Sequence, residues 1–315
     1  MKRINIVTIK NFYTFTSKEW AHLEHNISTS LNEQDISNIQ GINERLSLQE
    51  IYQIYLPIIR LFDFQKKNKP THKTFIIGLC GSVSVGKTTI ARLLQALLQQ
   101  HLENSHIDII STDNFIYPLE TLIEKNLLSK KGFPESYNSD LMIDCITNIS
   151  QTGSATCPIY SHIHYDILPD QFISIKQPNV LIVEGLNTLQ SQNQQSLPSL
   201  KSFFDISIYI DAPETLIKDW YIERFLKFKK DIFPQKENYF HHYSKLSEKE
   251  AIDTASEIWD SINGFNLKQF IKPTKDEANI ILQKGRDHFV EKILVDEQTQ
   301  ADIRRYMANN DPINL

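Results

Sequence analysis

The segment with the clearest capacity for chemistry is the octapeptide GSVSVGKT at 81–88, which has the spacing G-x-x-x-x-G-K-[ST]. An apolar run precedes it and a helical pattern follows it, as this motif requires. Glycines let successive N–H groups point inward, and the next helix N-terminus favours an anion. Lys87 would reach the β- and γ-phosphates of a nucleotide, and the Thr88 hydroxyl would ligate Mg²⁺. The predicted nucleotide-binding residues are Gly81, Ser82, Val83, Ser84, Val85, Gly86, Lys87, Thr88 and Thr89.

Two acidic residues each follow a short apolar run: Asp113 comes after IDIIST and Glu184 after NVLIV. Ligands of open α/β sheets bind beyond the carboxyl ends of the strands, so either carboxylate could lie near a bound phosphate. One could accept the proton of a substrate hydroxyl, and the other could hold Mg²⁺ directly or through water. The predicted metal-binding residues are Thr88 and Glu184. The alternative for each acid is a helix cap or a turn.

A helix with a basic and aromatic face is predicted to start at the segment DAPE, 211–214, which combines a capping acid, an early proline and a following glutamate. Tyr221, Arg224 and Phe228 then follow at i, i+3 and i+7 and share one face. Arg224 could neutralise charge on a transferred phosphoryl group. The alternative is a solvated basic face, because lysines stand at 227, 229 and 230.

A second capping box, SEKE at 247–250, predicts another helix. We place the end of this helix at Asn263, with Gly264 as its cap. The amide of Asn263 could recognise a polar ligand there, or the residue could simply end the helix.

A metal site built from histidines or cysteines and a disulfide are not favoured by the sequence. His162 and His164 would share one face of a strand, but no third ligand stands at a useful spacing. The cysteines show no ligand spacing and are odd in number, so we predict buried thiols without a disulfide: Cys80, Cys145 and Cys157.

The candidate site residues must be positioned by the secondary structure around them, and in this sequence short apolar runs alternate with helical patterns. Such runs are typical of a mostly parallel central sheet with helices on both faces, an α/β fold; they stand at 74–80, 107–111, 180–183, 206–210 and 279–282. We predict one domain over 1–315, made of an N-terminal helical segment (1–70), a binding core (71–290) and a polar C-terminal tail (291–315). A polar loop is expected at 191–196, and helices of a lid region after 211.

The composition limits the kind of ligand. A net charge of −5 and a pI near 6.1 give no global electrostatic reason to bind nucleic acid, so an anionic ligand needs a local cluster of donors. No apolar run approaches the ~18 residues of a membrane span. These features predict a cytoplasmic protein with no nucleic-acid or membrane partner.

Dense segments between the motifs resemble the type I bacterial pantothenate kinases, which open coenzyme A biosynthesis. The resemblance covers about residues 20–282; its segments are GINERLSLQEIYQIYLP at 41–57, KGFPESY at 131–137, PIYSHIHYD at 158–166, VEGLN at 183–187, DAPE at 211–214, WYIERFLKF at 220–228, YFHHYSKL at 239–246 and NLKQFIKPT at 266–274. It implies a P-loop kinase fold, a homodimer, and phosphorylation of the primary hydroxyl of pantothenate by ATP with Mg²⁺.

The resemblance also implies a role for individual positions. Asp113 would be the catalytic base, and Lys87 and Arg224 would contact the ATP phosphates and stabilise the transferring group. The implied pantothenate-binding residues are Arg92, Asp113, Tyr160, His162, Tyr221 and Asn263. Coenzyme A would act as a feedback inhibitor overlapping the ATP site, bound by Lys87, His162, Arg224, Phe225, Phe228, Phe240 and Tyr243.

The chain departs from the family pattern in three places. The segment 61–74 is short, the tail beyond residue 293 is long, and Asn114 stands where members often carry glycine. Two other functions stay open: a uridine- or phosphoribulose-type P-loop kinase, and a non-catalytic nucleotide or coenzyme A sensor. The joint presence of Lys87, Asp113 and Arg224 argues against the sensor.

Overall fold

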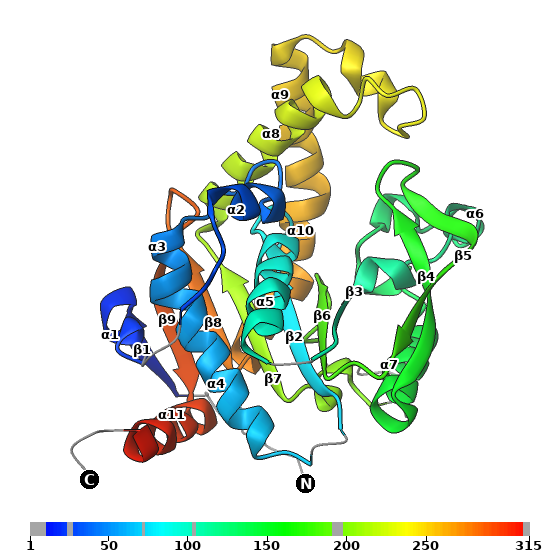
Figure 1. Ribbon diagram of the computed structural model, residues 1–315. Helices are drawn as coiled ribbons and strands as arrows, with labels where there is room; N and C mark the ends of the chain where they lie inside the picture. The colour runs from blue at the N-terminus through cyan, green and yellow to red at the C-terminus, as the bar shows by residue number, and fades with distance from the viewer. Residues whose placement is uncertain (1–10, 24–27, 71–72, 103–104, 191–197, 311–315) are drawn as a thin grey trace, which may run out of the picture.

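A computed structural model of the chain describes residues 11–23, 28–70, 73–102, 105–190 and 198–310 (Figure 1). Within these residues one sheet has seven strands in the order β1-β9-β8-β7-β2-β6-β3, and a second sheet pairs β4 with β5. The strands are β1 (Phe12–Thr16), β2 (Phe75–Gly81), β3 (Ile107–Ser111), β4 (Ser154–Ser161), β5 (Asp166–Lys176), β6 (Val180–Gly185), β7 (Ile206–Asp211), β8 (Ile280–Lys284) and β9 (Val290–Asp296). The loop predicted at 191–196 lies outside the described residues.

The centre of the large sheet is parallel. β2 lies between β6 and β7, β3 continues the parallel pairing beyond β6, and β8 continues it beyond β7. All seven residues of β2 are buried, as expected for a strand with both faces covered. The five predicted strands and the α/β fold class are therefore confirmed.

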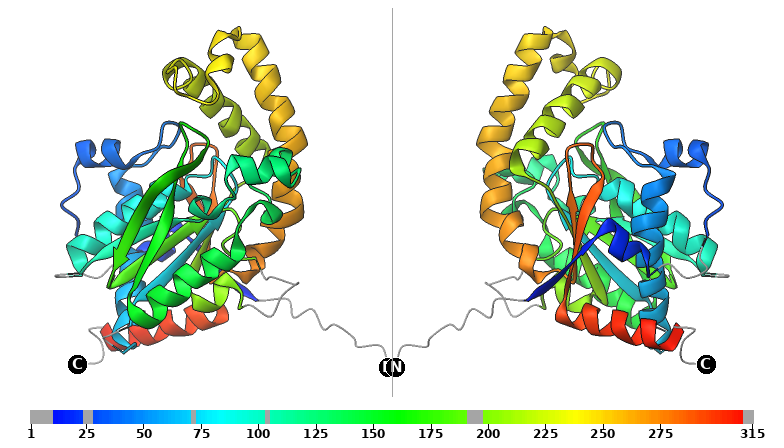
Figure 2. Two further views of the ribbon diagram at one scale, coloured as in Figure 1. Left: turned by 90° about the vertical axis from the view of Figure 1, so that its right-hand side faces the viewer. Right: turned by 90° about the vertical axis from the view of Figure 1, so that its left-hand side faces the viewer.

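Helices cover both faces of this sheet (Figures 1 and 2). The α-helices are α1 (Ser17–Ala21), α2 (Glu33–Ile39), α3 (Leu48–Glu50), α4 (Leu56–Lys67), α5 (Lys87–His101), α6 (Leu119–Glu124), α7 (Ser139–Thr152), α8 (Glu214–Asp231), α9 (Glu248–Ile258), α10 (Gly264–Asn266) and α11 (Glu297–Asn310). Alternate residues of β2 point to opposite faces: Ile77 belongs to the core cluster that includes Leu94 of α5, and Ile76 to the one that includes Ile146 of α7.

A helical lid rises from the end of β7 (Figure 2). It consists of α8, of the segment 232–247 that connects it to α9, of α9, and of the π-helical and α-helical turns that continue α9 to Ile271. The capping box of Ser247 and Glu250 at the start of α9 is confirmed. Gly264, by contrast, has helical backbone angles (φ −67°) and does not cap a helix, so Asn263 lies inside a longer helical rod.

Three other local predictions are wrong. Asp211 does not cap α8: it ends β7 and binds Lys275 (2.6 Å), and α8 starts without a side-chain cap. The N-terminal segment is not entirely helical, because 12–16 form β1, which pairs antiparallel with β9. The segment predicted as a polar tail holds most of β9 and the helix α11. Its polar residues are the exposed side of an amphipathic helix, which composition alone does not reveal.

The prediction of unpaired cysteines is wrong for one pair. Cys145 of α7 and Cys157 of β4 form a disulfide, whereas Cys80 is buried and free. The packing of α7 against β4 brings these two residues together, and nothing in their sequence spacing indicates it.

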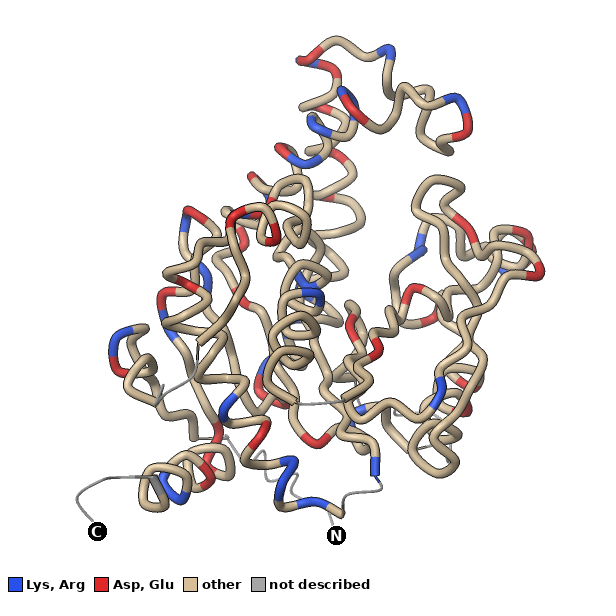
Figure 3. The backbone as a smooth tube through the Cα atoms, in the orientation of Figure 1, with Lys and Arg blue, Asp and Glu red and all other residues tan. Residues whose placement is uncertain are grey.

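Charges of both signs are interspersed along the described backbone (Figure 3). No helix in the described ranges is long and apolar enough to cross a membrane.

Candidate active site

The phosphate-binding loop connects the buried strand β2 to the N-terminus of α5. Ser84 (φ +59°) and Gly86 (φ +92°) adopt left-handed backbone conformations, which turn successive N–H groups toward a common centre. The Lys87 amine donates to the Ser82 carbonyl (2.7 Å). The hydroxyl groups of Ser82 and Ser84 are buried without a hydrogen-bond partner among the described residues. The loop therefore offers donors for an anion that the protein itself does not satisfy.

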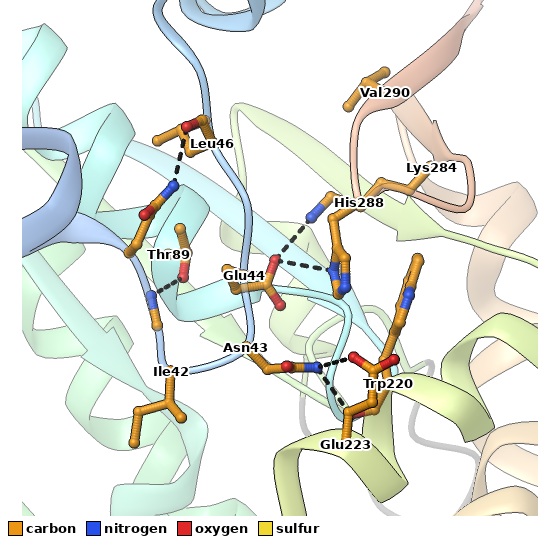
Figure 4. A network of polar contacts seen from close by, with 12 residues as sticks. Ile42, Asn43, Glu44, Leu46, Thr89, Trp220, Glu223, Lys284, His288 and Val290 are labelled. Atoms are coloured by element: carbon orange, nitrogen blue, oxygen red, sulfur yellow. Dashed lines mark hydrogen bonds and ion pairs between the residues drawn. The ribbon is translucent and has the colours of Figure 1, made fainter. Parts of the chain in front are cut away.

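An N-terminal connector, residues 40–46, closes over this loop (Figure 4). A Cβ on Gly86 would lie 2.3 Å from Oε2 of Glu44, so only glycine fits there. The Glu44 carboxylate accepts from Lys284 (3.1 Å) and lies 3.7 Å from Nδ1 of His288. Burial alone would raise the pKa of Glu44, but the two basic groups hold it below its usual value.

The connector also contacts the helices on either side of the loop. The Gly41 N–H donates to the Thr89 hydroxyl (3.0 Å). The Asn43 amide donates to the Trp220 carbonyl (3.1 Å) and to Glu223 (3.3 Å) of the lid helix α8. The N-terminal segment thus helps to build the site. Sequence reasoning gave Asn43 and Glu44 no role there, although GINERLS was quoted as part of the resemblance.

Four charged groups meet beside the loop. Burial lowers the pKa of Lys87, while the neighbouring Glu184 and Asp113 oppose that change. Burial raises the pKa of Glu184, and Lys87 opposes it. Burial likewise lowers the pKa of Arg224, which interacts with Glu44, Asp113 and Glu184 among others. The Thr88 hydroxyl donates to Glu184 (3.2 Å), so the predicted metal-binding oxygens are adjacent.

Asp113 and Glu184 are not helix caps. Asp113 lies in a 3₁₀ turn that Ser111 caps, with the Asp113 N–H donating to the Ser111 hydroxyl (3.3 Å). The Tyr137 hydroxyl donates to Asp113 (3.4 Å). Glu184 is part of β6 and 5% exposed. Neither carboxylate stabilises a helix terminus, so both are available for chemistry.

Sequence reasoning missed a lysine, Lys131, that interacts electrostatically with Asp113. The Lys131 amine lies 3.8 Å from the centre of the Tyr165 ring and 5.0 Å from that of Tyr160, and it donates to the Tyr165 carbonyl. Burial lowers the pKa of Lys131 to about 8, and Asp166 and Asp113 oppose that change. Its only sequence signal was the quoted segment KGFPESY at 131–137.

Tyr160 and His162 lie beside this lysine on the β4–β5 hairpin. Their rings contact each other edge-on at 5.1 Å. Burial lowers the pKa of His162, and the nearby Asp113 opposes that change. His162 and His164 stand in the turn after β4 and not on a strand. The described residues contain no group of three or more metal-ligating side chains.

The lid carries an aromatic cluster over the same space. Arg224 stacks over the Phe228 ring (4.9 Å), and the Tyr221 hydroxyl bonds to Asn263. The other predicted lid residues belong to this cluster, namely Phe225, Phe240 and Tyr243. The Tyr239 N–H donates to the Ile163 carbonyl (2.8 Å), so the lid contacts the hairpin turn.

The structure therefore brings together nearly all residues predicted at this site. Arg92 differs from the rest: it is exposed on α5, one turn beyond Thr88. Among the described residues, Arg92 makes no hydrogen bond or ion pair with the hairpin or the lid.

Comparison with known proteins identifies the kind of fold that carries this site. The model of the Phosphoribulokinase / Uridine kinase family matches residues 76–228. The YGR205w protein has a similar structure (TM-score 0.56, 13% identity, 80% of this chain and 99% of that chain), which shows a shared fold alone.

Full-length sequence relatives are more specific. A pantothenate kinase of Shewanella woodyi is 45% identical over 94% of this chain and 99% of its own length. One of Pasteurella multocida is 46% identical over 90% and 94%. Identity at this level over nearly the whole length of both chains shows the family: the chain belongs to the pantothenate kinases.

Proposed function

We propose that this protein transfers the γ-phosphoryl group of ATP to the primary hydroxyl of pantothenate, the first step of coenzyme A biosynthesis. The observation that carries the proposal is the meeting of Lys87, Asp113, Glu184 and Arg224 beside the phosphate-binding loop. The relatives named pantothenate kinase supply the identity of the acceptor.

In the proposed reaction Asp113 accepts the proton of the hydroxyl group. The hydroxyl oxygen forms a bond to the γ-phosphorus, and the bond from that phosphorus to the β-phosphate oxygen breaks to release ADP. Lys87 and Arg224 offset the charge on the transferring group. Positioning supplies a further share of the acceleration, because the P-loop and the hairpin hold the two substrates in line.

Mg²⁺ would be held by the Thr88 hydroxyl and the Glu184 carboxylate, and it would neutralise phosphate charge. These two side chains fit that role: they are oxygen donors within 3.2 Å of each other, and Mg²⁺ usually takes one or two protein ligands with phosphates and waters as the rest.

The pantothenate pocket is proposed to lie between Asp113, the hairpin and the lid. Tyr160, His162, Tyr221 and Asn263 would line it, together with Lys131, whose ammonium group suits the carboxylate of pantothenate. Arg92 is kept in this set on the resemblance alone.

Feedback inhibition by coenzyme A is a separate proposal. The aromatic lid cluster offers an apolar surface beside Arg224, where the inhibitor would overlap the ATP site at Lys87 and His162. We further propose a cytoplasmic, single-domain homodimer.

A coupled assay of ADP release tests the function. Pantothenate should stimulate ADP release, whereas uridine and ribulose 5-phosphate should not. Stimulation by one of the latter would instead favour the uridine or phosphoribulose alternative. Nucleotide binding without turnover on any acceptor would favour a sensor. Repeating the assay with added coenzyme A tests the inhibition.

A further inference from the structure

Asn114 makes a contact that none of the proposed catalytic roles requires. It follows Asp113 in the 3₁₀ turn after β3 and is 7% exposed. Its side-chain Oδ1 accepts a hydrogen bond from the Tyr160 N–H (3.1 Å), 46 positions further along the chain. One side chain thus joins the turn that carries Asp113 to the hairpin strand that carries Tyr160.

The Tyr160 N–H is available because of the geometry of the hairpin. β4 pairs with β5 alone among the described strands, and their register shifts between Pro158 and Tyr160. Ile167, which is opposite Tyr160, gives its own N–H to the Asp166 carboxylate (2.8 Å). The N–H of Tyr160 bonds to Asn114 in place of the hairpin ladder, and a half-buried N–H without an acceptor would be costly.

The position of Tyr160 relative to Asp113 matters for the site. The Tyr160 ring contacts the Lys131 amine and the His162 ring, and its hydroxyl interacts electrostatically with Asp113. A two-stranded hairpin is barely stable by itself, so its contacts with the main body fix where its side chains lie. The bond to Asn114 fixes the backbone of Tyr160, whose side chain also packs against the cluster of Ile116, Leu122 and Tyr137.

We propose that Asn114 is a positioning residue that holds the Tyr160 side of the substrate pocket at a set distance from Asp113. The inference rests on the proposed function in one respect, the identity of pantothenate as the ligand of that pocket. A residue without a side-chain acceptor at this position could not make the contact.

The first experiment needs no substrate. The protein is labelled with ¹⁵N-tyrosine, which limits the spectrum to 12 tyrosine amides, and amide exchange of Tyr160 is measured. Asn114→Ala should speed this exchange at least about tenfold, while Asn114→Asp, which keeps an acceptor oxygen, should restore protection. Asn148→Ala, an exposed substitution on α7, is the matched control and should leave the Tyr160 amide unchanged.

The second experiment separates positioning from general damage. Loss of one hydrogen bond that orders the pocket should raise the KM for pantothenate about three- to tenfold in Asn114→Ala, with the KM for ATP within about twofold. The Asp variant is used for exchange only, because its new charge lies beside Asp113.

Two results would overturn the proposal: unchanged exchange of Tyr160 in Asn114→Ala, or an equal rise of both KM values. If the unaltered protein shows no turnover with pantothenate, the proposed function fails. The exchange measurement still decides whether Asn114 holds Tyr160.

Discussion

Glu50 offers a quantitative test of the electrostatics around the N-terminal connector. It is 5% exposed, and its Oε1 accepts the Val290 N–H (2.9 Å). Its second carboxyl oxygen has no hydrogen-bond partner among the described residues. Burial raises its pKa from 4.5 to about 7; the Val290 N–H and Lys284 oppose this change and Glu44 adds to it.

The direction of the pH effect follows from these two values. Between pH 4.5 and 7 the folded protein binds more protons at Glu50 than the unfolded chain does, so the free energy of unfolding must fall as pH rises. The difference in pKa corresponds to ~3 kcal/mol, of which roughly 2.5 kcal/mol is lost between pH 5 and 8. Glu50→Gln keeps one acceptor for Val290 and cannot ionise, so it should escape this loss.

Denaturant unfolding at pH 5 and pH 8 measures the effect. The stability of Glu50→Gln relative to the unaltered protein should rise by roughly 2.5 kcal/mol between the two pH values. Glu124→Gln, an exposed substitution on α6, controls for the loss of one negative charge. A Glu50→Gln stability difference that is the same at both pH values would refute the reasoning, because the carboxyl would then not titrate between them.

Three further predictions concern the site itself. Asp113→Asn should lower kcat about 10³-fold and leave ATP affinity, measured by titration calorimetry, within about twofold, because it removes the base and no phosphate contact. Gly86→Ala should raise the KM for ATP at least about tenfold, since its φ is +92° and the new Cβ would meet Glu44. With the pKa of Lys131 near 8, the KM for pantothenate should rise as pH passes from 7 to 9, and Lys131→Met should abolish that dependence. Unchanged kinetics in any of these assays would contradict the corresponding role.

The sequence was sufficient to predict the structure where the local residue pattern and the tertiary packing favour the same element. The phosphate loop, the capping box at Ser247 and the five central strands depend on short segments whose residue types specify their structure. The strand-end acids could be located because parallel strands present their carboxyl ends at one edge. The sequence alone therefore predicts that Asp113, Glu184 and the loop lie in one site.

The sequence was insufficient where a contact joins distant segments. β1 is a strand because β9 supplies its partner, and Cys145 meets Cys157 because α7 packs on β4. Glu44 and Lys284 are 240 positions apart and become partners only when the connector lies on the β8–β9 hairpin. The local sequence does not indicate such pairings. Without a known partner, charged residues such as Glu44 and Lys284 are predicted to be exposed.

The charged residues of the site balance one another. Lys87 and Arg224 contribute two positive charges, and Asp113 and Glu184 two negative ones. Burial disfavours the charged forms of Lys87, Arg224 and Glu184, and neighbouring groups of opposite charge offset that effect. These four groups together are therefore nearly neutral, and they cannot by themselves balance a triphosphate. We propose that a cation arriving with the nucleotide completes the balance, held by the adjacent oxygens of Thr88 and Glu184.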